Sequence, residues 1–547
     1  MRLNDCFENG PTDNSYQKKI IVSSFILLLL IHVIFTFAGF YGNDDINYAR
    51  YAAEVAHNGI SFSPALDQYQ LRWVTVYSTA LFYWLFGINT FTSTLSSTIS
   101  FVLCGILLHK ILCCKKTGIY FFSMTLFFFA RSIIFYSHRL LPDPTMCLAI
   151  LWMYYCYRSY NLKKQRYFSY GIQFSVALSL AILTKETIII ALPLFLIFFL
   201  KDIFKRQNLQ FWKIVILLSL IFSMAYLLYF KITTGEFFYR YSVLLKKSYF
   251  NECSFDKLPF IYTLRRIGYE LWKAMLLNGD FLVLLPGIIS VIYIKKIKRE
   301  SIKRMDIFSF LILLVCSNFM SISVSSYVPL CHSPRHFLFL FPFAAITGGP
   351  MLYAYFKQPA KFILLPLAFA IVTVVIFVLN GGTTKYLYLL LTLLLVSCYL
   401  FSVFKNKIFP FAAVILFTGL LFMNYVIDFI KPLYPYYWDE KEVIEKQFSG
   451  KNMSATVFSD GLSGELSEFF LKFKTGNLKF LSIDSARTVN NGPLYFLLNG
   501  DLYPSSKNKM DSLMKSSEYS NIFIVYRKKN VYLYKINNAA LQMLREN

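Results

Sequence analysis

Two adjacent carboxylates, Asp44 and Asp45, are the residues of this sequence whose position best suits chemistry. They follow the first long apolar segment, residues 20–40, and precede a stretch with helical spacing of polar side chains. Asp is favoured in the first turn of a helix, so the pair could simply begin that helix. A carboxylate at a membrane surface could also act as a general base that takes the proton of an acceptor hydroxyl group. The residues alone leave both interpretations open.

The stretch after the acidic pair predicts a helix lying in the membrane interface. Arg50 and Glu54 fall on its polar face at i,i+4 spacing, and Asn58-Gly59 is typical of a helix end. A second interfacial helix is predicted over 73–86, where tryptophan and tyrosine residues of the kind that settle at headgroup level recur.

Five more charged residues stand at the ends of apolar segments, near the membrane face predicted for the acidic pair: Arg72, Arg139, Asp143, Lys185 and Arg335. Charged groups in such places are costly and often functional. Guanidinium groups stay charged and can grip a phosphate with two hydrogen bonds. The plainer alternatives are that each cation snorkels to the interface, that Asp143 starts a helix, and that Lys185 and Glu186 neutralise each other.

Four histidines are expected on the same side, which is enough for a tetrahedral zinc site: His57, His138, His332 and His336. Pro334 interrupts any helical i,i+4 placement of His332 and His336. The residues therefore do not favour a metal site, and a divalent metal stays open as the alternative.

The composition restricts the class of protein that can carry these residues. The chain of 547 residues has 55 Lys and Arg against 30 Asp and Glu, a net charge of +25, yet it is 56% hydrophobic and 16% charged. Soluble proteins hold roughly 45–50% apolar and about 25% charged residues. A disordered basic tail is excluded by the many aromatic residues, and a nucleic-acid partner would need a soluble domain to carry the basic residues. The composition predicts an α-helical polytopic membrane protein whose positive charge is sorted to one side of the bilayer.

Apolar segments approaching the ~20 residues of a membrane span predict about thirteen transmembrane helices, several of them short. The segments are 20–40, 91–109, 118–137, 144–157, 168–184, 187–200, 214–230, 281–294, 307–326, 337–356, 362–379, 386–404 and 408–427. Lys/Arg clusters such as 295–299 alternate between loops in a way that places the N-terminus in the cytoplasm. Residues 1–430 are then a membrane domain with large outer loops at 41–90 and 231–280.

The tail, residues 431–547, is predicted to lie outside the membrane. Strand-like runs alternate there with a helical run near 462–472, which predicts a small α/β domain. The basic loop 231–280 could bind anionic lipid headgroups or a lipid-linked phosphate. Cys253 and Cys331 are expected on the outer side, and the sequence leaves open whether they form a disulfide.

An ordered set of motifs resembles the GT-C membrane glycosyltransferases of the protein O-mannosyltransferase and aminoarabinose (lipid A) transferase type. After the acidic pair, the set comprises Tyr48–Ala56, Arg72, Ala80–Gly87, Arg139–Pro144, Leu183–Glu186 and Ser333–Phe337. The resemblance covers roughly residues 20–350. It implies a GT-C-like fold with a small C-terminal extracytoplasmic domain.

The same resemblance implies an integral-membrane enzyme that moves a sugar from a polyprenyl-phosphate carrier to an acceptor on the outer face, with inversion and without a metal. The first acid of the family's pair corresponds to Asp44, and Asp45 stands where the family usually has Glu. Arg72 loosely matches a basic residue before the second interfacial helix, and Arg335 matches an arginine that opens a late span. We therefore expect Asp44 to be the base, Asp45 to help position the acceptor, and the cations to hold the carrier phosphate.

The expected partners are the polyprenyl-phosphate-linked sugar, membrane lipids, and an acceptor that is a glycan, a lipid such as lipid A, or a protein; no nucleic acid is expected. The abundance of Ile, Phe, Lys, Asn and Tyr favours an AT-rich bacterium and its inner membrane. A lipid or glycan transporter is the main alternative, although no internal repeat is evident. A catalytically inactive relative that only binds the carrier is the third.

Overall fold

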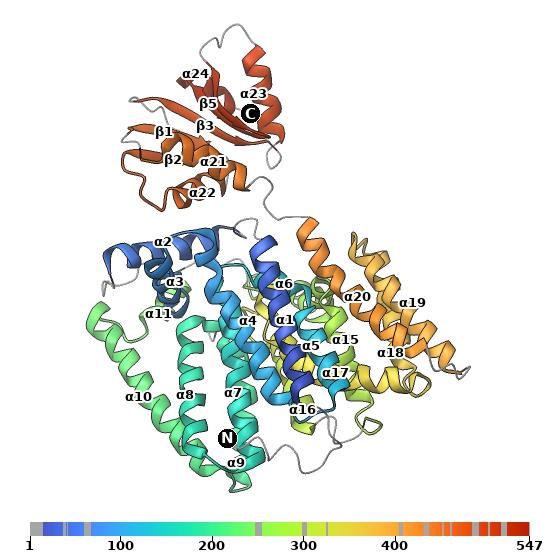
Figure 1. The fold of residues 1–547 in the computed structure, drawn as a ribbon. Helices are drawn as coiled ribbons and strands as arrows, with labels where there is room; N and C mark the ends of the chain where they lie inside the picture. Colours follow the sequence, from blue (N-terminus) through green and yellow to red (C-terminus); the bar gives the residue numbers. More distant parts are fainter. Residues whose placement is uncertain are drawn as a thin grey trace.

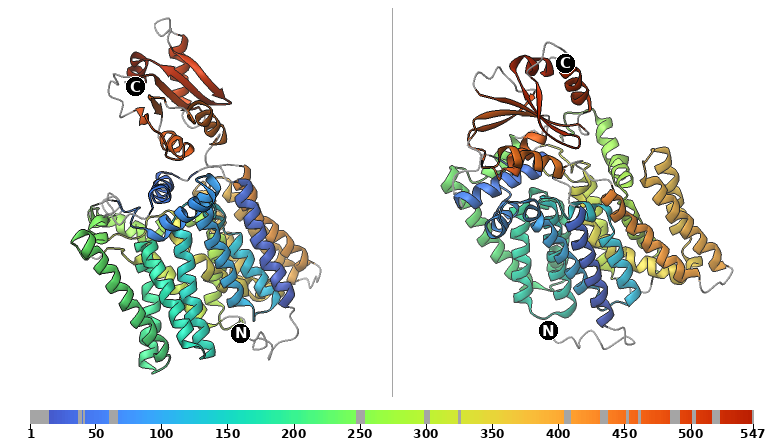
Figure 2. Two further views of the ribbon diagram at one scale, coloured as in Figure 1. Left: turned by 60° about the vertical axis from the view of Figure 1, so that its left-hand side comes forward. Right: turned by 45° about the horizontal axis from the view of Figure 1, so that its top comes forward.

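The computed structural model describes a helical bundle capped at one end by a small sheet domain (Figure 1). The described residues are 15–36, 40, 42–59, 67–246, 254–297, 303–323, 326–403, 409–430, 437–450, 453–459, 462–483, 492–500, 504–515 and 522–545. The end of the bundle that faces the sheet domain is called the domain end below. The first helix starts at the opposite end (Figures 1 and 2).

The bundle is built from long apolar helices in chain order. They are α1 (Ser15–Thr36), α4 (Thr90–Leu112), α5 (Thr117–Phe128), α6 (Arg131–Tyr136), α7 (Asp143–Lys163), α8 (Tyr167–Thr184), α9 (Leu192–Phe204), α10 (Leu209–Thr234), α15 (Phe281–Ile292), α16 (Arg304–Phe319), α17 (Leu340–Lys357), α18 (Leu364–Val378), α19 (Thr384–Val403) and α20 (Phe409–Ile430). Helix α17 packs against both α5 and α15, and α7 packs against α4 and α8. Gly349 makes the first of these contacts possible, because a Cβ atom there would lie 2.0 Å from Ser123 Oγ on α5.

Each of the predicted apolar segments overlaps a helix of the bundle. Among the described residues, five helices are long and apolar enough to cross a membrane, judged by length and composition: Ser15–Thr36, Thr90–Leu112, Tyr167–Thr184, Leu209–Thr234 and Thr384–Ser402. Several of the others are shorter apolar helices of 10–17 residues. The fold class is therefore as predicted, and the number of spans stays a prediction.

The predicted span 118–137 is broken between α5 and α6, and a buried acid explains the break. Asp280 accepts hydrogen bonds from Ser132 N (3.1 Å) and Ser132 Oγ (2.6 Å). These bonds satisfy donors at the start of α6 that a continuous helix would direct at its own carbonyls. Asp280 lies far from Ser132 in the sequence, so hydropathy alone could not show the interruption.

Two helices lie across the domain end, as the sequence predicts. They are α2 (Asn43–Asn58) and α3 (Trp73–Phe86), which pack against each other. Ala49, Ala52 and Ala53 are fully buried, which gives α2 the apolar face expected of it. Arg50 forms its ion pair with Glu468 of the sheet domain at 3.0 Å, where the sequence suggested Glu54.

The segment after α10 is mainly helical. It contains α11 (Tyr239–Leu245), α13 (Phe260–Arg265), a π-helical turn η3 (Arg266–Glu270) and α14 (Leu271–Asn278). Three short 3₁₀ turns lie elsewhere in the bundle: η2 (Glu186–Ile190), η4 (Pro334–Phe337) and η5 (Pro359–Lys361). Cys331 is disulfide-bonded to a partner outside the described residues. Because Cys253 lies outside them, its pairing with Cys331 stays a prediction.

The C-terminal part forms a mixed five-stranded sheet with helices. Its strands run in the order β2-β1-β3-β5-β4, with β1 parallel to β2 and β3, and β5 antiparallel to β3 and β4. All five were expected: β1 (Ala455–Ser459), β2 (Leu478–Ser482), β3 (Leu494–Asn499), β4 (Phe523–Lys528) and β5 (Val531–Ile536). Helix α22 (Leu462–Phe470) matches the predicted helical run. The sequence reading missed three polar helices, α21 (Tyr437–Phe448), α23 (Pro504–Lys515) and α24 (Asn538–Arg545).

Candidate active site

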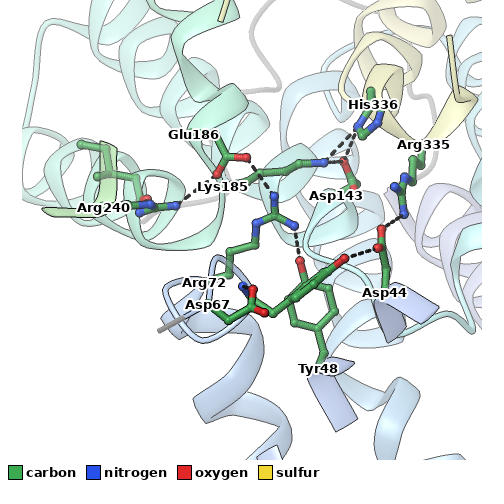
Figure 3. Close-up of polar contacts among 12 residues, drawn as sticks. Asp44, Tyr48, Asp67, Arg72, Asp143, Lys185, Glu186, Arg240, Arg335 and His336 are labelled. Carbon is green, nitrogen blue, oxygen red and sulfur yellow. Dashed lines mark hydrogen bonds and ion pairs between the residues drawn. The ribbon is translucent and has the colours of Figure 1, made fainter. Parts of the chain in front are cut away.

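Asp44 lies in the first turn of α2, at the domain end of the bundle, and both of its carboxylate oxygens are engaged (Figure 3). Oδ2 is 2.6 Å from Nη1 of Arg335, which lies in η4 just before α17. Oδ1 accepts a hydrogen bond from the hydroxyl group of Tyr69 at 2.6 Å. The structure thus places the expected base in contact with one of the expected phosphate-binding cations.

Arg72 precedes α3 and is held by two acceptors. Its Nη2 forms an ion pair with Glu186 Oε1 at 2.8 Å, and its Nη1 donates to the hydroxyl group of Tyr48 on α2. Glu186 lies at the start of η2, and its second oxygen is 3.4 Å from Nη2 of Arg240 on α11. One carboxylate therefore bridges two guanidinium groups from different parts of the chain.

A third group of charges is almost completely buried beside these pairs. Lys185 donates from Nζ to Asp143 Oδ1 at 2.6 Å and lies 2.9 Å from His336 Nδ1. His336 Nδ1 is also 3.3 Å from Asp143 Oδ1, but one nitrogen atom cannot accept from lysine and donate to aspartate at once. The shorter contact and the always protonated lysine favour Nδ1 as the acceptor, with His336 neutral.

These eight residues, Asp44, Arg72, Asp143, Lys185, Glu186, Arg240, Arg335 and His336, are called the charged cluster. They come from five separate stretches of the chain and meet at the domain end (Figure 3). Arg335 joins the groups, since it interacts electrostatically with both Asp143 and Asp44. The cluster combines four cations with three carboxylates, so one positive charge is left over for an anionic ligand.

Electrostatics keep the carboxylates of the cluster charged. Burial alone would raise the pKa of Asp44, but the charge of Arg335 and the hydrogen bond from Tyr69 outweigh it and hold the pKa below its usual value. Burial has the same effect on Glu186, and Arg72 and Arg240 overcome it to hold the pKa at about 2. Burial also lowers the pKa of His336 to about 4, and the charge of Lys185 adds to that effect. At neutral pH the cluster therefore holds ionised acids and a neutral imidazole.

Two of the residues singled out in the sequence lie apart from the charged cluster. Asp45 is fully buried, and its Oδ1 accepts a hydrogen bond from Gly42 N at 2.9 Å, which closes the first turn of α2. Arg139 is buried with its guanidinium group over the ring of Phe135, 4.9 Å from the centroid. Lys185 and Glu186 do not neutralise each other, because each is paired with a different residue.

Four members of the site had no predicted role in it: Tyr48, Tyr69, Glu186 and Arg240. The sequence gave a signal for only one of them, Arg240, as part of the basic segment 231–280. Tyr48 and Tyr69 resemble the many other tyrosines of this aromatic chain. Their ring centroids lie 5.2 Å apart, with the guanidinium group of Arg72 within about 6 Å of each.

The histidines considered as zinc ligands are dispersed. His336 lies with Lys185 and Asp143, His332 lies 3.4 Å from Glu270, and the ring of His138 packs on that of His32. Within the described ranges, no group of three or more His, Cys, Asp or Glu residues could hold a metal ion.

Comparison with solved structures identifies the fold. The chain is similar to ArnT from Cupriavidus metallidurans bound to undecaprenyl phosphate, with a TM-score of 0.55 and 12% sequence identity over 95% of this chain and 98% of that one. The apo state of the same protein gives a TM-score of 0.52 over the same shares. No protein-family model and no curated protein matches the sequence. The chain therefore has the GT-C membrane-protein fold of ArnT, which is the resemblance that the order of its motifs predicts.

Proposed function

We propose that the protein is an integral-membrane glycosyltransferase that moves a sugar from a polyprenyl-phosphate carrier to an acceptor at the domain end of the bundle. The observation that carries the proposal is the 2.6 Å contact between Asp44 and Arg335. It joins a carboxylate that can act as a base to a cation that can hold a phosphate. The ArnT structure of the same fold has undecaprenyl phosphate bound, which supports a carrier of this kind.

In the proposed reaction, Asp44 accepts the proton of an acceptor hydroxyl or amine group. The acceptor atom attacks the anomeric carbon from the side opposite the phosphate, so the configuration inverts. The bond between that carbon and the phosphate oxygen breaks, and its electron pair leaves with the polyprenyl phosphate. The leaving group is already an anion, so cations fixed beside it can stabilise the charge that it gains.

Arg335 and Arg72 are the proposed phosphate ligands. Glu186 positions Arg72, and Lys185 and Asp143 form the buried support behind Arg335. The burial of Asp45 favours a role in holding the first turn of α2, so that it positions the base. Arg139 is packed on Phe135, which gives it a weaker claim on the phosphate than Arg72.

The reaction is proposed to need neither a metal nor another cofactor. The domain end would face the outer side of a bacterial inner membrane, with the N-terminus in the cytoplasm and residues 431–547 as an extracytoplasmic domain on the membrane domain 1–430. The acceptor class proposed is a glycan, a lipid such as lipid A, or a protein.

The test compares Asp44→Asn with the parent protein and with Glu54→Gln, which removes an exposed acid from the same helix. Purified protein in nanodiscs receives undecaprenyl-phosphate sugars labelled in the sugar, with membranes of the host as the acceptor source. Asp44→Asn should insert normally, bind undecaprenyl phosphate and transfer no label, whereas Glu54→Gln should remain active. Retained transfer by Asp44→Asn contradicts the proposed base. Movement of label across the bilayer without transfer would instead identify a transporter, and binding alone an inactive relative.

A further inference from the structure

A second polar cavity lies between the bundle and the sheet domain, away from the charged cluster. It has a volume of about 280 Å³ and lies where α3 ends and α4 begins, beneath α21 and α22. Phe86 and Asn89 line its bundle side, and Lys441 and Lys472 line its sheet-domain side. Helix α3 separates this cavity from Arg72, because its 14 residues span ~20 Å at 1.5 Å per residue.

The cavity favours a negative charge. Lys441 and Lys472 contribute two cations, and the one acid in the lining, Glu445, is 3.8 Å from Lys441. The N-terminal end of α4, a 23-residue helix, also points its positive dipole end at this place. The opposing C-terminal end of α22 contributes little, since its last carbonyl groups already accept from the backbone N–H groups of residues 471–473.

An apolar surface runs from the cavity along α3. Leu81, Trp84, Leu85 and Phe86 are all more than half exposed, and Trp84 is 71% exposed. On the other side of the cavity, Trp438 is also more than half exposed, with Lys441 Nζ 5.4 Å from its ring centroid. Tryptophan side chains that are exposed at the end of a helical bundle settle at the level of lipid headgroups.

We propose that this cavity binds the phosphate headgroup of an anionic phospholipid from the leaflet on the side of the sheet domain. Lys441 and Lys472 hold the phosphate, and the acyl chains lie along Leu81, Leu85 and Phe86 of α3. The two halves of the site come from the bundle and from the sheet domain. A bound lipid therefore ties the sheet domain to the membrane surface.

The test uses phosphatidylglycerol that carries a photoactivatable group on its acyl chain, titrated into phosphatidylcholine nanodiscs containing the full chain. A matched photoactivatable phosphatidylcholine measures labelling without charge preference. Crosslinks are mapped by mass spectrometry to peptides from the end of α3, the start of α4 and α21. Sugar transfer plays no part in this readout, so it is independent of the proposed function.

The parent protein should label these peptides with phosphatidylglycerol in clear preference to phosphatidylcholine. Lys441→Gln and Lys472→Gln should each raise the half-saturating phosphatidylglycerol fraction about fivefold, the equivalent of about 1 kcal/mol per lysine at an anionic surface. The pair Lys441→Arg and Lys472→Arg keeps the charge and should keep the binding, which separates loss of charge from loss of folding.

The matched control is the pair Lys479→Gln and Lys535→Gln, exposed strand lysines of the same domain that do not line the cavity. It should leave labelling unchanged. Equal labelling by the two lipids, unchanged labelling of the Lys441→Gln/Lys472→Gln protein, or an equal loss in the control pair would each overturn the proposal.

Discussion

Replacing Arg335 by glutamine should move the acid limb of the pH–rate profile to higher pH. The active form of Asp44 is the carboxylate, so activity is present above the pKa of Asp44 and is lost as the pH falls through it. Burial raises this pKa, and Arg335 is the first of the groups that lower it. Without Arg335 the effect of burial prevails, and the loss of activity begins at a higher pH.

The size of the change follows from the 2.6 Å contact between Asp44 Oδ2 and Arg335 Nη1. Two unit charges about 4 Å apart attract by about 4 kcal/mol at an effective dielectric constant of about 20. Since about 1.36 kcal/mol corresponds to one pH unit, this is an upper figure of about 3 pH units. The side chains are 18% and 27% exposed, and solvent reduces the attraction, so we expect the limb to move by about 1 to 3 pH units.

The assay is kcat/KM for transfer from labelled undecaprenyl-phosphate sugar at low donor concentration, between pH 4 and 9, because this ratio reports the free enzyme. Arg335→Lys is the control, since it keeps the charge and should keep the acid limb near its original position. The glutamine variant should also be slower at all pH values if Arg335 holds the phosphate, but a uniform loss of rate does not move the limb. An acid limb at the same pH in Arg335→Gln and the parent protein would refute the assigned control of Asp44 by Arg335.

Three further outcomes are expected from the charged cluster. Glu186→Gln should lower the free energy of unfolding at pH 7 by about 3 kcal/mol, because a folded pKa of about 2 against an ordinary 4.5 is worth about 1.36 kcal/mol per unit. That contribution is present above pH 4.5 and is lost toward pH 2, so thermal unfolding of the two proteins should converge in acid; the exposed Glu442→Gln should change stability far less, and an equal change would contradict the argument. His336→Gln should flatten the decrease in the unfolding temperature of the parent protein between pH 6.5 and 4, where the unfolded chain binds a proton that the buried imidazole refuses; an unaltered slope would exclude this assignment. Asp44→Asn should bind undecaprenyl phosphate more tightly by roughly tenfold, as expected when one partly exposed charged competitor is removed, and weaker binding in a direct titration would show that Asp44 does not compete for Arg335.

The large features of the fold could be predicted from the sequence because they depend on local patterns. The apolar segments, the two interfacial helices and the five strands each carry their own periodicity. The break between α5 and α6 could not be predicted, because its cause is Asp280, a residue from another helix. Helices α21, α23 and α24 were missed because their polar composition hides the helical spacing of their few apolar residues.

The candidate site was predictable in its residue types and not in its pairings. Asp44, Arg72, Asp143, Lys185 and Arg335 stood out as charges at the ends of apolar segments. Which of them meet depends on how distant helices pack, and spacing along the chain carries no such information.

Glu186 shows the consequence of this limit. Its neighbour in the sequence, Lys185, is the obvious partner by adjacency. The backbone at this point is extended before η2 begins, so consecutive side chains diverge. Lys185 reaches Asp143 and Glu186 reaches Arg72, which turns an expected local pair into two long-range links.

The pairings suggest how binding of the donor and activation of the base are connected in the proposed reaction. Buried cations need partners, and in the absence of a phosphate those partners are Asp44 for Arg335 and Glu186 for Arg72. A carrier phosphate that binds Arg335 must weaken its contact with Asp44, which frees Oδ2 to accept a proton. Loss of the neighbouring guanidinium also makes the carboxylate a stronger base. Asp44 is then most basic when the donor is bound, so the acid that stands beside the cation in the empty site is held there as a base until its competitor arrives.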